Sequence, residues 1–187
     1  MSTRTIHSLL VAAAALTGAC AASSPDSEGG GEASAQTEAE THAAETSACS
    51  RYGGPGEVGG VVSEHIVPAL TGDCRVSAMF TSLPEPAQVH LVECLTIQVQ
   101  ELFACEGASY AGAEDSTGAL CRDMVSAHAG LGITNGDFDA VIEDIVAGLQ
   151  AAGISQADID AVAPAVLSTR ADMVEVQTDA LSNSSCG

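Results

Sequence analysis

The sequence predicts an all-α fold, and three of its features support that prediction. Apolar residues recur at i, i+3, i+4 and i+7 in several segments, which is the spacing of one buried helix face. Two of those segments begin with a Ser or Thr that has an acidic residue three positions later, a pattern typical of a helix start. No segment alternates apolar and polar residues over the length of a strand.

The first 19 residues have the features of an export signal. Arg4 precedes an apolar run at 9–16, which is too short to span a membrane and is followed by small residues. The residues Leu-Thr-Gly-Ala-Cys at 16–20 resemble the lipoprotein box of bacteria, in which Cys20 would be lipidated. Cleavage within Ala-Cys-Ala at 19–21 would instead release an ordinary secreted chain. We therefore predict a lipoprotein-type signal peptide at 1–19 and an exported protein, lipid-anchored to a bacterial membrane and facing the periplasm or the cell surface.

The next 29 residues, at 20–48, contain no large apolar side chain and are rich in Ser, Glu, Ala and Gly. Such a segment cannot bury enough surface to offset its ordering entropy, so we predict a disordered acidic linker there and a folded domain at 49–187. The chain has a formal net charge of -20, with five Arg and no Lys. Five cations are too few to follow a phosphate backbone, and we therefore expect no nucleic-acid partner. We expect contact with a membrane through the lipid anchor only.

Four helical segments are expected in the domain. They lie, in order, at Val58–Leu70, Pro86–Phe103, Thr134–Leu149 and Ser155–Leu167. Gly, Ser, Ala, Asp and Glu dominate between the second and third segments, which predicts an irregular loop up to Arg122. Pro164 lies inside the last segment and is expected to bend that helix or to shift its start.

Six cysteines remain in the domain once Cys20 is set aside. An even number beyond an export signal predicts three disulfides, although six cysteines allow fifteen pairings. The spacing favours a short loop closed by one pair, a second pair that joins the domain ends, and a third pair from the remaining cysteines. These pairs are Cys105–Cys121, Cys49–Cys186 and Cys74–Cys94. No Cys-x-x-Cys occurs, so a zinc ribbon is not expected.

The segment from Arg122 to Val174 resembles the truncated (two-over-two) haemoglobins of group I. The motif Met-x-x-x-His-x-Gly at 124–130, the Phe ten residues after the His, and the Ala-Gly-Ile at 152–154 match that family without a gap. Upstream, SRYGGPGEV, RVSAMF and HLVECLT resemble the family's entry segment, its aromatic corner and its helix E. The resemblance covers the whole domain, with an insertion at 106–120, and it implies a two-over-two helical sandwich.

The resemblance also implies haem b as the cofactor. His128 matches the proximal histidine that binds the haem iron, and neutral imidazole is a suitable axial ligand. Gly130 and Gly132 match the turn that follows it. The other positions that match haem contacts of the family are Phe80, His90, Leu91, Ile133, Phe138 and Val141.

The distal positions depart from the family. Ile66 stands where its usual helix-B Tyr lies, and Leu91 stands where its usual distal Gln lies. His90 matches a position at which some relatives supply a sixth iron ligand, and His65 is a candidate distal hydrogen-bond donor.

The resemblance predicts a protein that binds oxygen, nitric oxide or carbon monoxide outside the cytoplasm, for storage, scavenging, sensing or electron transfer with a redox partner. Nitric oxide dioxygenation is linked with the group, but it needs a reductase that this chain lacks, so we make no prediction that the protein is an enzyme. Two alternatives to a gas-binding haem protein stay open at this point. One is a haem-less, globin-like structural or interaction module held by disulfides, and the other is a zinc or other metal centre at His65, His90 and His128. No nucleophile–His–acid spacing supports a hydrolase.

Overall fold

The computed structural model describes residues 47–186. The predicted signal peptide, Cys20 and nearly all of the predicted linker lie outside the described residues. Ser47 and Ala48, predicted as the end of the linker, belong instead to the folded part, because the Ser47 side chain accepts a hydrogen bond from the Ser50 backbone N–H and caps the first helix.

The described part is helical, as the sequence predicts. Its helices are α2 (Ala48–Arg51), α3 (Pro55–Val61), the π-helix η1 (Val62–Ile66), α4 (Val67–Gly72), α5 (Ser77–Thr81), α6 (Glu85–Leu102), α7 (Met124–His128), α8 (Asn135–Ala151), α9 (Gln156–Ser168) and α10 (Arg170–Met173). Within residues 47–186 the only strand-like pairings are two isolated bridges, Glu114 with Leu120 and Thr134 with Val176.

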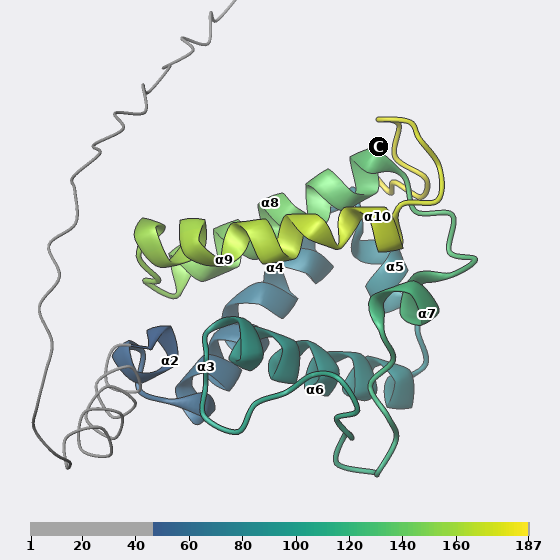
Figure 1. Cartoon of the computed structure of the whole chain (residues 1–187). Coiled ribbons are helices and arrows are strands. Elements are labelled where there is room, and N and C mark those ends of the chain that lie inside the picture. Colours follow the sequence, from purple (N-terminus) through teal and green to yellow (C-terminus); the bar gives the residue numbers. More distant parts are fainter. Residues whose placement is uncertain (1–46, 187) are drawn as a thin grey trace, which may run out of the picture.

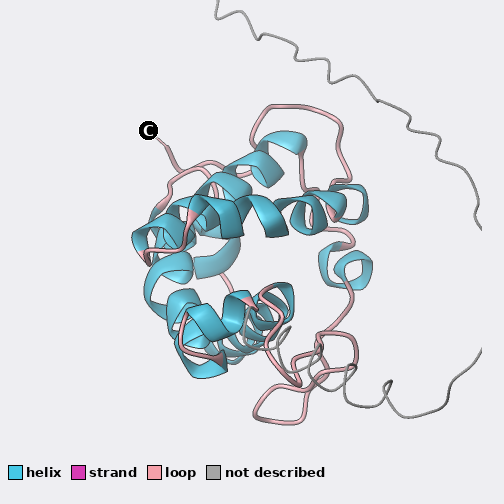
Figure 2. Cartoon of the chain, turned by 60° about the vertical axis from the view of Figure 1, so that its left-hand side comes forward, coloured by secondary structure: helices cyan, strands magenta, loops and turns pink. Residues whose placement is uncertain are grey.

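The helices form two layers (Figures 1 and 2). Helix α6 packs against α3 and η1 in the lower layer of Figure 1, and α8 and α9 form the upper layer. The chain crosses between the layers through η1 and α4, both of which contact α8. Helix α7 lies apart from the layers at one end, where it contacts α10. This arrangement is the two-over-two sandwich that the resemblance implies.

Local signals set the starts of the long C-terminal helices. Thr134 and Asp137 form a complete capping box at α8, in which each side chain accepts a hydrogen bond from the other residue's backbone N–H. Ser155 caps α9 by accepting from the N–H of Asp158. Pro164 lies inside α9, as expected from the sequence.

One turn of π-helix interrupts the segment predicted at Val58–Leu70. Pro68 has no N–H to donate to the carbonyl four residues earlier, at Glu64, and its ring would clash with that carbonyl in a regular α-helix. The wider turn at η1 ends two residues before this proline, where the helix has to accommodate it. Val62 and Ile66 within the turn are fully buried.

Three disulfides are present, as predicted, but the predicted pairing is wrong for all three. The structure joins Cys49 to Cys105, Cys74 to Cys186, and Cys94 to Cys121. The predicted short loop does not close on itself because its two ends pack on different helices. Cys105 lies under α2, where the Cys49 backbone N–H donates to the Phe103 carbonyl at 2.8 Å, and Cys121 reaches α6.

The predicted pair Cys49–Cys186 would put the C-terminal end beside α2, which is wrong. Cys186 lies beside the connection between α4 and α5, where the Ser185 N–H donates to the Cys74 carbonyl at 2.8 Å. None of the described helices is long and apolar enough to cross a membrane.

Candidate functional site

His128 is the last residue of the short helix α7. The Asp123 side chain caps this helix by accepting from the Ser126 N–H at 2.9 Å. His128 Nδ1 lies 2.7 Å from the Met124 carbonyl oxygen, one helical turn earlier. A carbonyl can only accept, so Nδ1 carries the proton, and Nε2 of the neutral ring keeps its lone pair. Metal-binding histidines have this arrangement, in which the second ring nitrogen is fixed by a hydrogen bond.

The turn after His128 depends on two glycines. Gly130 has φ of 80° and Gly132 has φ of 68°, in the left-handed region that favours glycine. Their backbone N–H groups both donate to the Glu175 carboxylate, at 2.5 and 2.6 Å. These two bonds, the Gly130 bond foremost, lower the pKa of Glu175. The chain thus leaves α7 through a turn that is held from the C-terminal tail.

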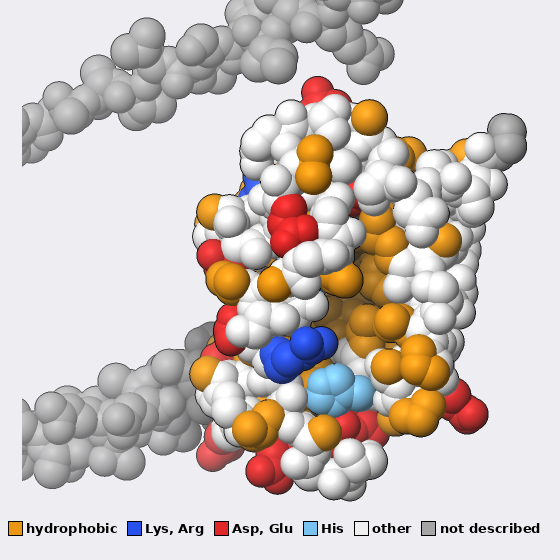
Figure 3. Space-filling model, turned by 90° about the vertical axis from the view of Figure 1, so that its right-hand side faces the viewer, with side chains coloured by type: hydrophobic (Ala, Val, Ile, Leu, Met, Phe, Trp, Pro, Cys, Tyr) orange, Lys and Arg blue, Asp and Glu red, His pale blue; other side chains and the backbone are white. Residues whose placement is uncertain are grey.

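A small apolar pocket, open to solvent on one side, lies between α4, α5 and α6. Its lining comprises Val67, Leu70, Thr71, Phe80, Leu83, Gln88, Leu91 and Val92. Figure 3 shows a hollow lined by hydrophobic side chains on this end of the molecule, with a histidine and a basic side chain at its lower edge. Two of the predicted haem contacts, Phe80 and Leu91, come together in this pocket.

The two polar side chains of the lining are already bonded within the chain. Thr71 Oγ1 donates to the Val67 carbonyl at 2.9 Å, and Gln88 Nε2 donates to the Leu83 carbonyl at 2.7 Å. Gln88 was not among the residues that the sequence indicated. It lies one helical turn before Leu91, so it shares the helix face on which the family's distal Gln was sought.

Comparison with known proteins supports one fold. A scan against known protein families finds no match, and a search of curated proteins finds none either. Among solved structures, a ferric glutamine-to-glutamate variant of the truncated haemoglobin from Tetrahymena pyriformis matches with 25% identity and a TM-score of 0.56, over 69% of this chain and 98% of that chain. A ferric tyrosine-to-phenylalanine variant from the same organism matches with 24% identity and a TM-score of 0.55, over the same shares.

The chain has the truncated haemoglobin fold. The predictions of an all-α, two-over-two architecture and of a truncated-globin fold are therefore confirmed. The assignment to group I and the lipoprotein form stay predictions.

The remaining predicted contacts of this globin lie around the start of α8. Phe138 and Ile133 are buried, and Val141 packs against the hydrophobic core. The Arg170 guanidinium stacks over the Phe138 ring, 4.3 Å from its centroid, and forms an ion pair with Asp139. None of these side chains lines the pocket between α4 and α6.

His90 faces the loop at 104–121 and does not line the pocket. Its Nδ1 lies 2.7 Å from Oδ2 of the buried Asp115, and its ring lies 3.7 Å from the Cys94 sulfur. Hydrogen bonds from Thr117, from His90 and from the Ala119 N–H lower the pKa of Asp115 strongly, so this carboxylate is ionised. As a sixth iron ligand, a role that stays a prediction, His90 would use Nε2, which the bond to Asp115 leaves free, but its ring lies outside the pocket lining.

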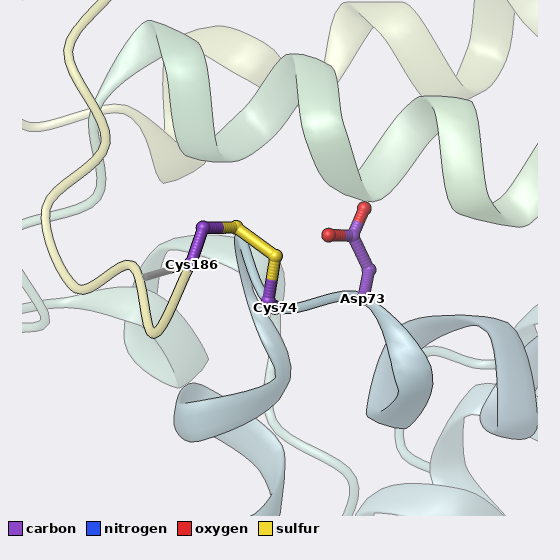
Figure 4. A group of neighbouring side chains, drawn as sticks. All are labelled: Asp73, Cys74 and Cys186. Carbon is purple, nitrogen blue, oxygen red and sulfur yellow. A yellow bond between two sulfur atoms is a disulfide. The ribbon is translucent and has the colours of Figure 1, made fainter.

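The three histidines do not form a metal centre in this globin. Half-buried His65 lies on η1 beside Ile66, outside the pocket lining. Across residues 47–186, only Asp73, Cys74 and Cys186 bring three metal-ligating atoms together. Figure 4 shows that both cysteines of this group are consumed in a disulfide, so no thiolate is left to bind an ion. The zinc alternative is therefore wrong for His65, His90 and His128.

Asp73 directs its carboxylate toward α8, where Asp144 is buried (Figure 4). Asp144 Oδ2 has no hydrogen-bond partner among the described residues. Arg75 binds Asp73 and Glu143 at 2.6 Å each, but its distance to Asp144 is 3.9 Å. Burial, followed by repulsion from Asp73, raises the pKa of Asp144 to about 6. This carboxyl group binds its proton more tightly in the folded state than in the unfolded chain.

We expect an Asp144→Asn substitution to stabilise the globin at pH 8. Because the folded pKa is raised, the free energy of unfolding of the wild type falls as the pH rises from about 4 to about 6 and stays lower above it. Asn removes that loss, so we expect a gain of about 1–2 kcal/mol at pH 8 and almost none near pH 4. Urea unfolding at both pH values measures the difference. The exposed neighbour gives the control Glu143→Gln, which should show no such gain, and an Asp144→Asn gain equal at both pH values would contradict the prediction.

Proposed function

We propose that this globin binds one haem b through Nε2 of His128 and takes up a diatomic gas. The observation that carries the proposal is the bond between His128 Nδ1 and the Met124 carbonyl, because it leaves Nε2 as the free ligand nitrogen. Haem supplies an iron atom that binds small gases. The six cysteines of the domain are all in disulfides, so none is left to attach haem covalently.

The chain's own residues have separate roles in this proposal. Phe80 and Leu91 offer apolar surface to the haem on the pocket side, and the buried Phe138 and Ile133 lie on the side of α8. Arg170 covers the outer face of Phe138 and limits its movement. Val141 continues this apolar surface along α8.

The pocket lining bears on which gas is held. Bound oxygen carries partial negative charge and is held better by a hydrogen-bond donor, whereas carbon monoxide and nitric oxide need none. Thr71 already donates to a backbone carbonyl, Gln88 has one of its two amide N–H groups bonded in the same way, and Leu91 and Ile66 have no donor at all. We therefore propose a scavenger, sensor or electron carrier for which nitric oxide or carbon monoxide is the better ligand, rather than an oxygen store.

We also propose that the protein acts outside the cytoplasm, held to a membrane by lipidated Cys20. The export signal of the sequence supports this, and so do three disulfides, which persist in oxidising compartments.

An absorption spectrum of the chain, purified from a haem-replete host, tests the haem proposal. We expect a Soret band with one haem per chain and, after reduction, one broad visible band of five-coordinate iron, because Asp115 holds the His90 ring toward the loop at 104–121, outside the pocket lining. Split, sharp visible bands that disappear in His90→Ala would show instead that His90 is the sixth ligand. A wild type that takes up no haem, even on titration with haemin, would favour the alternative, a haem-less module held by its disulfides.

A further inference from the structure

The C-terminal segment at 174–186, which we call the strap, runs back along the connection between α7 and α8. Its Glu175 and Val176 N–H groups both donate to the Ile133 carbonyl, at 2.9 and 3.0 Å. Farther along, the Ser182 N–H donates to Asp137 at 3.0 Å. The strap therefore contacts the stretch that begins directly after His128 and ends in the first turn of α8.

Glu175 makes the contact nearest to His128. Its two carboxylate oxygens each accept one backbone N–H, from Gly130 and from Gly132, which are two and four residues after the histidine. Ala129 and Gly130 are exposed, so they have little packing to hold them. The carboxylate thus restrains a turn whose glycines would otherwise give the backbone much freedom.

The far end of the strap is fixed to the connection between α4 and α5. Ser185 donates to the Cys74 carbonyl from both its N–H and its Oγ, at 2.8 and 3.0 Å, and Cys186 is bonded to Cys74 (Figure 4). Both of these cysteines are exposed, whereas the four cysteines of the other two disulfides are buried. The strap is therefore tethered by the disulfide that a reductant in solution reaches most easily.

We propose that the strap positions His128, with Glu175 as the positioning residue and the Cys74–Cys186 disulfide as its anchor; this rests on the proposed function. His128 takes its ring orientation from Met124, within a helix of five residues. A helix of five residues has little stability of its own. The turn that follows α7 must therefore be held by contacts with other parts of the chain. Glu175 does this on one side of the histidine, as Asp123 does at the start of the helix.

Glu175→Gln is the first test, because an amide cannot accept two N–H groups as a carboxylate does. We expect the variant to lose haem to excess apomyoglobin about three- to tenfold faster than the wild type, at the lower end of effects seen for groups that orient a metal-binding histidine. The iron–histidine stretching band of the ferrous protein, measured by resonance Raman, is expected to broaden or to shift to lower frequency. In the haem-free protein, the amide protons of Gly130 and Gly132 are expected to exchange faster with solvent.

Glu93→Gln is the matched control. Glu93 also accepts a backbone N–H and a hydroxyl, both from Ser116, at 2.7 and 2.8 Å, but it lies on α6 and its bonds go to the loop at 104–121. This control should leave haem loss, the iron–histidine band and the two glycine amides unchanged. A paired Cys74→Ser and Cys186→Ser variant should act in the same direction as Glu175→Gln, since the strap then loses its anchor.

The outcomes separate the two proposals. If the wild type binds haem and Glu175→Gln changes neither haem loss nor the iron–histidine band, the positioning role is wrong and the proposed function stands. If the wild type binds no haem, the proposed function is wrong. Amide exchange in that haem-free protein then decides whether the strap restrains the turn, and an unchanged exchange rate of Gly130 and Gly132 overturns it. Should Glu175→Gln fold poorly, Glu175→Asp, which is too short to reach both amides, provides the same readouts.

Discussion

We expect the His128→Ala variant to lose stoichiometric haem binding. Alanine removes the nitrogen that the Met124 carbonyl leaves free, and no histidine lines the pocket between α4, α5 and α6 to replace it. The apparent affinity for haem should fall by more than about 100-fold, because losing mere partners of a ligating histidine already costs 10–100-fold. The Soret absorbance per chain after haemin titration measures this. His65→Ala is the control, because it removes a half-buried histidine that is predicted only as a distal hydrogen-bond donor, and it should keep one haem per chain.

A His128→Gly variant sharpens the result. Imidazole added to the solution should restore the Soret band, because the small molecule can occupy the space that the side chain leaves. Rescue would show that the missing group is a ligand and that the fold is intact. An unchanged Soret band and stoichiometry in His128→Ala would refute the proximal assignment.

A large effect on stability is expected at Gly148, where α8 crosses η1. A Cβ at this position would lie 2.8 Å from the Ile66 Cα and 3.0 Å from the His65 carbonyl oxygen. Both are backbone atoms, so Gly148→Ala can be accommodated only if the two helices move apart. We expect a loss of about 2–4 kcal/mol in the free energy of unfolding, the upper part of the range for overpacking. Urea unfolding of the oxidised protein measures it.

Gly60 provides the matched control for this substitution. It also lies in a helix, but nothing lies within 4 Å of the position that its Cβ would take. Gly60→Ala should therefore stabilise the protein by about 0.5–1 kcal/mol, because alanine has less conformational freedom to lose on folding. Equal stabilities of the two variants would show that the crossing of α8 and η1 is not as close as the structure has it.

The sequence predicts the helices well where the signals are local. The boundaries of α8 and α9 follow from Thr134 with Asp137 and from Ser155 with Asp158, which act within one helical turn. The π-helical turn at η1 was not predicted, although Pro68 was visible in the sequence, because a proline marks a disturbance without specifying the geometry that relieves it.

The candidate site divides in the same way. His128 and its partner Met124 are four residues apart, so the resemblance and the helical spacing together locate them. Asp115 and Glu175 could not be found, because they reach His90 and Gly130 from 25 and 45 residues away. The disulfide pairing was wrong for the same reason, since closeness in sequence says little about closeness in space once a loop folds over a helix.

The observed disulfides give the loop at 106–120 an unusual position in the covalent network. Cys94 and Cys74 precede this loop in sequence, and their partners Cys121 and Cys186 follow it. A protease that cuts the backbone within the loop would therefore produce two fragments that are still joined by two covalent bridges. His128 and α8 would stay tied to α6 and to the corner between α4 and α5. Such a nick would be visible only after reduction, and it would leave the pocket and His128 in one covalent assembly.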